Sequence, residues 1–220
     1  MYFPSPIETF KKLGELLTGS YIYLSIGWTL LRTLIGFLTS LFAALVFGLL
    51  AGSFRSIYLF LKPLITVFKS LPTAALVFLF IVLSGSRYAP TYIVFLISFP
   101  ILYESIVGGI KSVPQDINDI LRIDTDGGLV PLFKIKVPIA SPYIIVGLAS
   151  SFALSLKTTI MAEIITGDTG YGLGNAIRAY RSLDPTDLTP IFAVSVIAIS
   201  IVLIVDLIGL AINKYIEKRQ

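Results

Sequence analysis

The chain contains no cysteine and no histidine among its 220 residues. Without cysteine there is no disulfide, no thiolate metal site and no cysteine nucleophile. Without histidine the chain lacks the commonest general base and metal ligand. These two absences leave hydrolytic and metal-dependent chemistry with few side chains to use, so we expect no catalytic residue, no metal site and no cofactor.

Charged residues are also scarce. They make up 14% of the chain, against roughly 25% in a typical soluble domain, while hydrophobic residues make up 55%. The formal net charge is +4, but the basic residues recur between apolar runs instead of forming one patch, as they do in membrane proteins. The composition therefore predicts a protein embedded in a lipid bilayer, with no nucleic-acid partner. The N-terminus has no apolar stretch ahead of a cleavage site, so no signal peptide is expected.

The apolar runs have about the length of a spanning helix, roughly 20 residues. Backbone groups in lipid must be hydrogen-bonded internally, and the runs lack the alternation of a membrane β-barrel, so they predict helices. The second run is less clean than the others because Lys69 and Pro72 interrupt it. The sequence predicts an all-α membrane protein with about five transmembrane helices, at residues 33–51, 64–83, 89–107, 139–165 and 190–212.

The distribution of Lys and Arg sets the expected orientation. An odd number of spans places the two ends of the chain on opposite sides, and more basic residues fall inside the cell if the C-terminus is cytoplasmic. Arg32 counts among the external residues in this arrangement. We therefore expect an amphipathic external lead-in at residues 1–32, a transmembrane domain at 33–212 with a cytoplasmic loop at 112–138, and a cytoplasmic tail at 213–220.

The central loop carries the most polar stretch of the chain, DINDILRIDTDGG. Pro114 suits a first helical turn, Asp116 and Asp119 complement the positive end of a helix dipole, and Gly127-Gly128 suits a helix end. The pattern predicts a short amphipathic helix, which is only marginally stable alone in water. The residues themselves leave two interpretations open, a capped helix in a solvated loop and a helix that docks on a partner protein.

Several blocks of the sequence resemble permeases of ATP-binding-cassette (ABC) importers for sulfonates, taurine, nitrate and thiamine precursors. FPSPIETFKKLGELLTG followed by TLLRTLIGF is similar to their P-S-P and S-L-x-R-x-x-x-G-F segments. Three later blocks of these permeases resemble the stretches KSLPTAALVFLFIVLSG, FPILYESIVGGIKSVP and AEIITGDTGYGLGNAI. The blocks occur in family order and cover nearly the whole chain. Aligned on Pro138, the central loop resembles the E-A-A signature of these permeases, with Asp119 at the Glu position.

The resemblance implies a type I ABC importer permease with a MetI-like core and a cytoplasmic coupling helix, in the prokaryotic plasma membrane. It implies as partners a second permease copy in a homodimer, two cytoplasmic ATP-binding subunits that hydrolyse ATP, and an extracytoplasmic substrate-binding protein. The chain itself is then not an enzyme. The resemblance also implies that an ATP-binding subunit contacts the loop residues Asp119, Arg122, Asp126, Gly127 and Gly128.

Four ionisable residues fall within the predicted spans or at their edges, where such residues are rare and usually functional. Glu163 lies in the A-E block near the outer end of its span, and we expect a structural or gate role for it rather than substrate binding. Lys157 either lines the path and favours anions, or pairs with Glu163 or Glu104. Asp206 is expected to satisfy a neighbouring helix or to pair locally, and Glu104 to be solvated at the cytoplasmic end.

Two rival functions stay open at this point. One is a secondary transporter or channel that works without ATP; it predicts a path within one chain, which five spans without inverted repeats do not favour. The other is a non-transporting assembly subunit, which predicts that no ATPase is encoded beside this gene.

Overall fold

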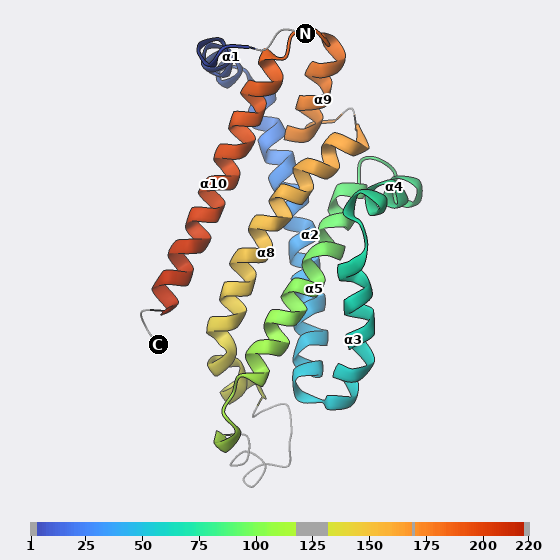
Figure 1. The fold of residues 1–220 in the computed structure, drawn as a ribbon, viewed down its shortest axis with the longest axis vertical. Helices are drawn as coiled ribbons and strands as arrows, with labels where there is room; N and C mark the ends of the chain where they lie inside the picture. Colours follow the sequence, from blue (N-terminus) through green and yellow to red (C-terminus); the bar gives the residue numbers. More distant parts are fainter. Residues whose placement is uncertain (1–3, 118–131, 169, 218–220) are drawn as a thin grey trace.

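The regular elements of the protein are helices arranged as an elongated bundle (Figure 1). The computed structural model describes residues 4–117, 132–168 and 170–217. Within these residues, four helical segments are long and apolar enough to cross a membrane, and a further bent pair of helices passes the same test together. The predicted fold class, an all-α membrane protein with about five spans, is confirmed. The four long segments are Ser20–Ser53 (α2), Ala89–Lys111 (α5), Lys134–Thr166 and Thr189–Ile216. The third segment begins in the π-helix η1 (Leu132–Lys136) and continues as α8 (Val137–Thr166), and the fourth lies within α10 (Thr189–Glu217).

The second predicted span, residues 64–83, is wrong as a single helix. The chain forms α3 (Arg55–Ser70) and α4 (Thr73–Ser84), whose axes differ by 97°. Leu71 and Pro72 between them are extended, with ψ of 129° and 121°. Proline disfavours helical dihedrals at the residue before it and donates no backbone hydrogen bond. Pro72 therefore breaks the apolar run, and α4 turns aside at one end of the bundle.

The helix that contains the first predicted span begins earlier than expected. α2 starts at Ser20, directly after the short helix α1 (Pro6–Thr18), and continues without a break to Ser53. Arg32, expected outside the membrane, therefore lies within a long helix, and its side chain is buried. The boundary between a lead-in at 1–32 and a membrane domain at 33–212 stays a prediction. The other predicted spans, 89–107, 139–165 and 190–212, lie within α5, α8 and α10.

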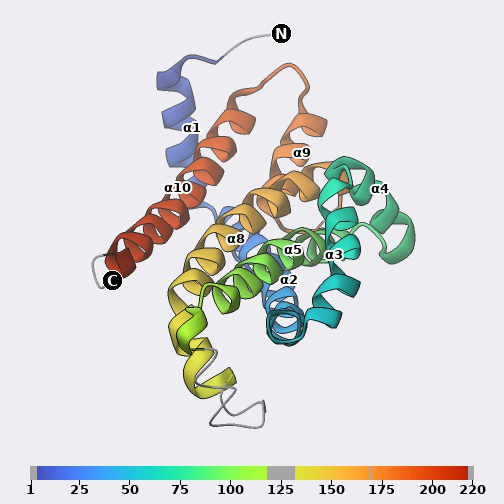
Figure 2. The same ribbon diagram turned by 60° about the horizontal axis from the view of Figure 1, so that its bottom comes forward.

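Helix α5 forms the centre of the bundle. In its apolar stretch 61% of the residues are buried, against 22% in that of α10. α5 packs between α2 and α8, and the largest cluster of buried apolar side chains joins these helices to α3. α10 lies at the edge of the bundle against α8 (Figures 1 and 2). Most of the α10 surface is therefore left for lipid or for another protein.

Glycines bring α2 close to α5. A Cβ atom added at Gly36 would come 2.6 Å from the Thr91 carbonyl oxygen and 2.8 Å from the Val94 side chain. Gly48 and Gly52, lower on the same face, meet side chains of α5 at similar distances. Small residues at such positions let two membrane helices approach closely, and dispersion contacts then hold them together.

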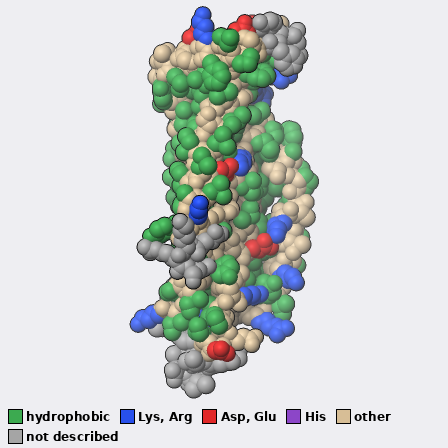
Figure 3. All heavy atoms as spheres, turned by 60° about the vertical axis from the view of Figure 1, so that its left-hand side comes forward, with side chains coloured by type: hydrophobic (Ala, Val, Ile, Leu, Met, Phe, Trp, Pro, Cys, Tyr) green, Lys and Arg blue, Asp and Glu red, His purple; other side chains and the backbone are tan. Residues whose placement is uncertain are grey.

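The two ends of the bundle are formed by different elements. α1, α4 and α9 (Leu173–Leu183) lie at one end, whereas the α2–α3 connection, the end of α5 and the start of η1 lie at the other (Figure 1). Between the ends, hydrophobic side chains cover much of the face shown in Figure 3. This separation places both described edges of the central loop at one end and the 163–188 region at the opposite end, as the predicted topology requires.

The close approach of α2 and α5 predicts a strong effect of Gly36→Ala. The added methyl group overlaps backbone and Val94, so the helices must move apart, which we expect to lower the free energy of unfolding by about 1–3 kcal/mol. Gly27→Ala, on the same helix, is the matched control. A Cβ atom added at Gly27 would meet no neighbouring part of the protein within 4 Å. Unfolding of both variants in detergent micelles measures the effect, and equal stability of the two would contradict this packing.

Candidate functional site

Glu163 is fully buried near the end of α8, and both of its carboxylate oxygens are hydrogen-bonded. Oε1 accepts a hydrogen bond from the Arg32 guanidinium at 2.8 Å. Oε2 accepts from the Thr29 hydroxyl at 2.8 Å and from the Gly174 backbone N–H at 3.0 Å. A buried carboxylate is tolerated only when it is paired and its oxygens are satisfied, and Glu163 meets both conditions.

Arg32 joins three parts of the chain at this point. One guanidinium nitrogen donates to Glu163 of α8 and also to the Tyr171 carbonyl oxygen at 2.8 Å. The other nitrogen donates to the Asp168 carboxylate at 3.1 Å. The ring of Trp28, one turn earlier on α2, lies 5.8 Å from the guanidinium carbon, within range of a cation–π contact. Arg32 therefore ties α2 to α8 and to the segment that leads into α9.

The same group of residues caps helix α9. The first N–H groups of a helix have no partner within it, and the N-terminal cap residue of α9, Gly172, has no side chain to supply one. Instead, the Leu173 N–H donates to the Thr29 hydroxyl at 2.8 Å, and the Gly174 N–H donates to Glu163. Negative charge at this position also complements the helix dipole. α9 is thus capped by residues of α2 and α8.

A side chain at residue 174 would prevent this arrangement. A Cβ atom built on Gly174 would overlap the carbonyl oxygen of Ile160 and the Cβ of Glu163. Glycine therefore lets the start of α9 rest directly on the backbone of α8, within hydrogen-bonding distance of the carboxylate.

Lys157 pairs with Asp206, and not with Glu163 or Glu104. Its ammonium nitrogen lies 2.9 Å from the Asp206 carboxylate, which joins α8 to α10. Both side chains are partly open, at 49% and 34% exposure. Glu104 of α5 pairs instead with Lys69 of α3 at 2.8 Å. A pocket of about 350 Å³ lies beside the Lys157–Asp206 pair, between α8 and α10.

The predicted coupling residues Asp119, Arg122, Asp126, Gly127 and Gly128 lie outside the described residues. Their contact with an ATP-binding subunit stays a prediction. In the part of the chain that the structure describes, no group of three or more Asp or Glu side chains is placed to hold a metal ion.

Sequence reasoning missed Arg32, Thr29 and Asp168, which complete the Glu163 site. A signal for Arg32 was present, because the arginine in TLLRTLIGF interrupts an apolar run. We assigned it to the external side when the first span was placed at residues 33–51. Thr29 and Asp168 gave no comparable signal, since hydroxyl and loop carboxylate groups are common near the ends of membrane helices.

A family model described as the binding-protein-dependent transport system inner membrane component matches residues 44–220. The chain belongs to this family. It is therefore a transport permease of the ABC importer type and a multi-pass membrane protein of the inner membrane. The resemblance found in the sequence is confirmed.

Several permeases are similar over most of the chain. The nitrate import permease NrtB of Leptolyngbya laminosa is 28% identical over 199 residues, 89% of this chain and 67% of the relative. A putative ABC transporter permease of Methanocaldococcus jannaschii is 29% identical over 94% of this chain and 74% of its own length. The putative aliphatic sulfonates transport permease SsuC of Bacillus subtilis is 24% identical over 77% of this chain and 62% of its own length. The chain spans about two thirds of the length of these curated relatives.

Solved structures of two ABC transporters share the fold. An amino acid ABC transporter crystallised with histidines superposes with a TM-score of 0.75 at 17% identity, covering 97% of this chain and 100% of that one. An inward-facing structure of the MetNI methionine ABC transporter superposes with a TM-score of 0.70 at 16% identity. The match covers 91% of this chain and 95% of that one. At such identities the likeness concerns the fold alone, and it confirms the predicted MetI-like core.

The buried Glu163 site predicts a large effect of Arg32→Met. Removing the guanidinium leaves a buried carboxylate without its cation, which we expect to cost about 3–5 kcal/mol of unfolding free energy. Arg87→Met is the matched control, because Arg87 also lies over Trp28, at 5.9 Å, but is exposed. Loss of the Arg87–Trp28 contact should lower the unfolding free energy by only about 0.5–1 kcal/mol. Denaturation in detergent micelles distinguishes the two variants, and equal losses would contradict the assigned role of Arg32.

Proposed function

We propose that this chain is the transmembrane permease subunit of an ATP-driven ABC importer. Two copies enclose the substrate path, two cytoplasmic ATP-binding subunits drive it, and an extracytoplasmic protein delivers the substrate. The observation that carries the proposal is the family match over residues 44–220, on a fold that superposes with two ABC importers.

The coupling role of residues 112–138 is supported by where the described edges of that loop lie. α5 ends at Lys111 and η1 begins at Leu132, both at the end of the bundle opposite α9 (Figure 1). A soluble ATP-binding subunit approaching this end would meet the described edges of the loop. Closure of the ATP-binding subunits would then move the loop and, through α5 and α8, switch the path between outward and inward access.

A second permease copy is supported by the position of the Lys157–Asp206 pair. It lies well inside the apolar stretches of α8 and α10, yet both side chains are partly exposed in the single chain. A charge facing lipid at that depth is costly, so membrane charges face protein or a water-filled cavity. We therefore propose that this face of α8 and α10 borders the path between two copies. Glu163, fully buried, is proposed instead to hold the outer ends of α2, α8 and α9 together.

The substrate we propose is a small anion. Two relatives are named for the import of nitrate and of aliphatic sulfonates. Lys157 supplies a cation on the face assigned to the path, partly balanced by Asp206.

If Lys157 contacts the anion, the two partners of the pair must respond differently. Lys157→Met removes the cation and leaves an unpaired carboxylate that repels the substrate, so we expect uptake to fall at least about tenfold, a barrier change near 1.4 kcal/mol. Asp206→Asn keeps the cation and should leave uptake within about twofold or raise it. The measurement is ATP-driven uptake of nitrate, an aliphatic sulfonate and bicarbonate into vesicles, using whichever the unmodified complex accumulates.

A purely structural pair gives a different pattern. Both single variants would then lose uptake equally, and Lys157→Met with Asp206→Leu would restore it. Unchanged uptake and unchanged anion preference in Lys157→Met would also contradict the proposed contact.

Charge reversal in the loop tests the coupling. We expect the double variant Asp119→Lys with Arg122→Glu to abolish ATP-driven uptake, because like charges would then face the groups that these side chains bind on the ATP-binding subunit. The measurement is uptake into vesicles together with ATP hydrolysis by the same complex. The control is Lys12→Glu with Glu15→Lys, which exchanges the exposed ion pair of α1 at the opposite end and keeps the net charge.

Transport retained in the loop double variant would contradict the coupling role. Uptake that continues when the ATP-binding subunits are left out would instead favour the rival function, an ATP-independent transporter.

A further inference from the structure

Helix α1 has three distinct faces. Counting 100° of rotation per residue, Glu8, Lys12 and Glu15 lie on one face. Leu13 and Leu16 lie about a quarter turn away. The remaining face carries an apolar stripe, defined here as Ile7, Phe10 and Leu17, at positions that recur every three to seven residues.

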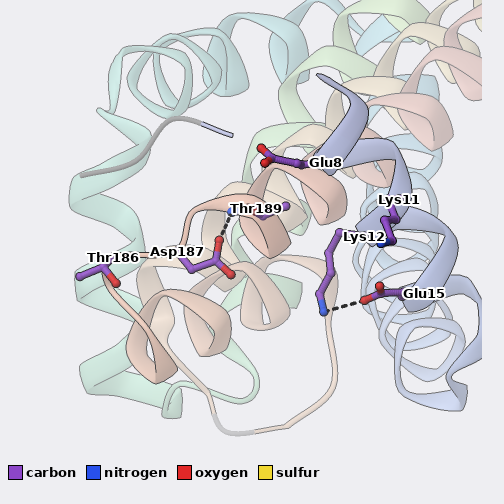
Figure 4. Close-up of a pocket in the computed structure, with 7 residues that line it drawn as sticks. All are labelled: Glu8, Lys11, Lys12, Glu15, Thr186, Asp187 and Thr189. Carbon is purple, nitrogen blue, oxygen red and sulfur yellow. Dashed lines mark hydrogen bonds and ion pairs between the residues drawn. The ribbon is translucent and has the colours of Figure 1, made fainter. Parts of the chain in front are cut away.

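The first face is polar and lines a pocket at the α9 end of the bundle. Figure 4 shows side chains of α1 on one side of this pocket and Thr186, Asp187 and Thr189 on the other. Lys12 donates a hydrogen bond to Glu15 at 2.9 Å, which lowers the pKa of the Glu15 carboxyl and raises the pKa of Lys12. Both groups therefore stay charged near neutral pH, and this face of α1 is suited to water.

The second face holds α1 on the membrane helices. Leu13 and Leu16 pack on a buried cluster that includes Val194 and Ile197 of α10. Those residues lie within the apolar stretch Thr189–Ile216, and not in the polar connection before it. α1 is therefore placed level with the first turns of a spanning helix, beside the zone where lipid begins.

The described residues leave much of the apolar stripe uncovered. Ile7 and Phe10 are 81% and 64% exposed, and Leu17 is 37% exposed. A Cβ atom added at Gly14, in the middle of this stripe, would meet nothing within 4 Å. Because Phe10 and Glu15 lie about 140° apart around the helix, the stripe faces nearly away from the polar pocket.

The direction of α1 agrees with this placement. Figure 1 views α1 nearly end-on while the bundle runs vertically, and Figure 2 shows its length, so α1 runs across the bundle axis. Its 13 residues are too few to span a bilayer. The Tyr23 hydroxyl donates to the Leu17 carbonyl oxygen at 2.9 Å, and tyrosine is enriched at membrane–water interfaces. An amphipathic helix in this position has the geometry of one that lies in the interface plane.

We propose that α1 is an interfacial helix whose apolar stripe, Ile7, Phe10 and Leu17, is inserted into the lipid leaflet at the α9 end of the bundle. The occupant of this stripe is lipid acyl chain, while the Lys12–Glu15 face stays in water. The proposal is independent of the transported substrate and of ATP coupling. It gives the membrane domain a contact with the leaflet in addition to those of its spanning helices.

The absence of cysteine makes the test direct, because a single introduced cysteine is the only site for a thiol-reactive fluorophore. The variants are Phe10→Cys and Ile7→Cys on the stripe, with Glu15→Cys as the control on the opposite face of the same helix. Each full-length chain is labelled and reconstituted in phosphatidylcholine vesicles, alone and with the co-expressed ATP-binding subunits. Quenching is measured with lipids that carry a spin label near the top of the acyl chain and with iodide in water.

We expect spin-labelled lipid to quench residues 7 and 10 several-fold more than residue 15, and iodide to show the reverse order. Iodide quenching at residue 10 equal to that at residue 15 would overturn the proposal. Shielding of residue 10 from both quenchers would also overturn it, since a protein surface would then cover the stripe. Gel filtration confirms folding, which Phe10→Cys should preserve because the side chain is exposed, and Ile7→Cys repeats the test at a second position.

Discussion

A carboxylate buried among membrane helices must be paired, and this requirement organises the α9 end of the protein. Glu163 is fully buried, so its charge is compensated by Arg32 and its oxygens by Thr29 and the Gly174 N–H. Arg32 and Thr29 belong to α2, Glu163 itself to α8, and Gly174 to α9. The positions of α2, α8 and α9 therefore depend on one another through this single group, which also serves as the missing cap of α9.

Among the described residues, two further ion pairs join helices and are more exposed than Arg32–Glu163. Lys69–Glu104 and Lys157–Asp206 are both partly open in the single chain. A closed pair such as Arg32–Glu163 is complete within one copy, whereas open pairs within apolar stretches require a polar neighbour. The α9 end is thus held by groups within one copy, whereas the open pairs leave room for the second permease copy proposed above. This division is the one expected of a permease whose path forms between two copies.

Much of the architecture follows from the sequence because lipid leaves few alternatives. Apolar runs of about 20 residues must be helices, so α5, α8 and α10 were predictable, and so was the family from the order of its blocks. Pro72 signalled the interruption of the second span, but the 97° turn depends on where α4 rests. The start of α2 was misplaced because Arg32 looked external, although its charge is neutralised by a residue 131 positions away in the chain. Such pairings are tertiary, and hydropathy alone does not contain them. The same holds for Lys157, whose partner Asp206 was one of several acids within the spans.

The central claim is that this membrane chain works with a soluble ATP-binding partner. The most direct measurement is the rate of ATP hydrolysis by an ATP-binding subunit that co-purifies with the permease, with and without the permease in vesicles that also contain a substrate-binding protein. We expect hydrolysis to rise when the permease is present and to rise further with binding protein and substrate. An unchanged hydrolysis rate, together with solute uptake that needs no ATP, would contradict it.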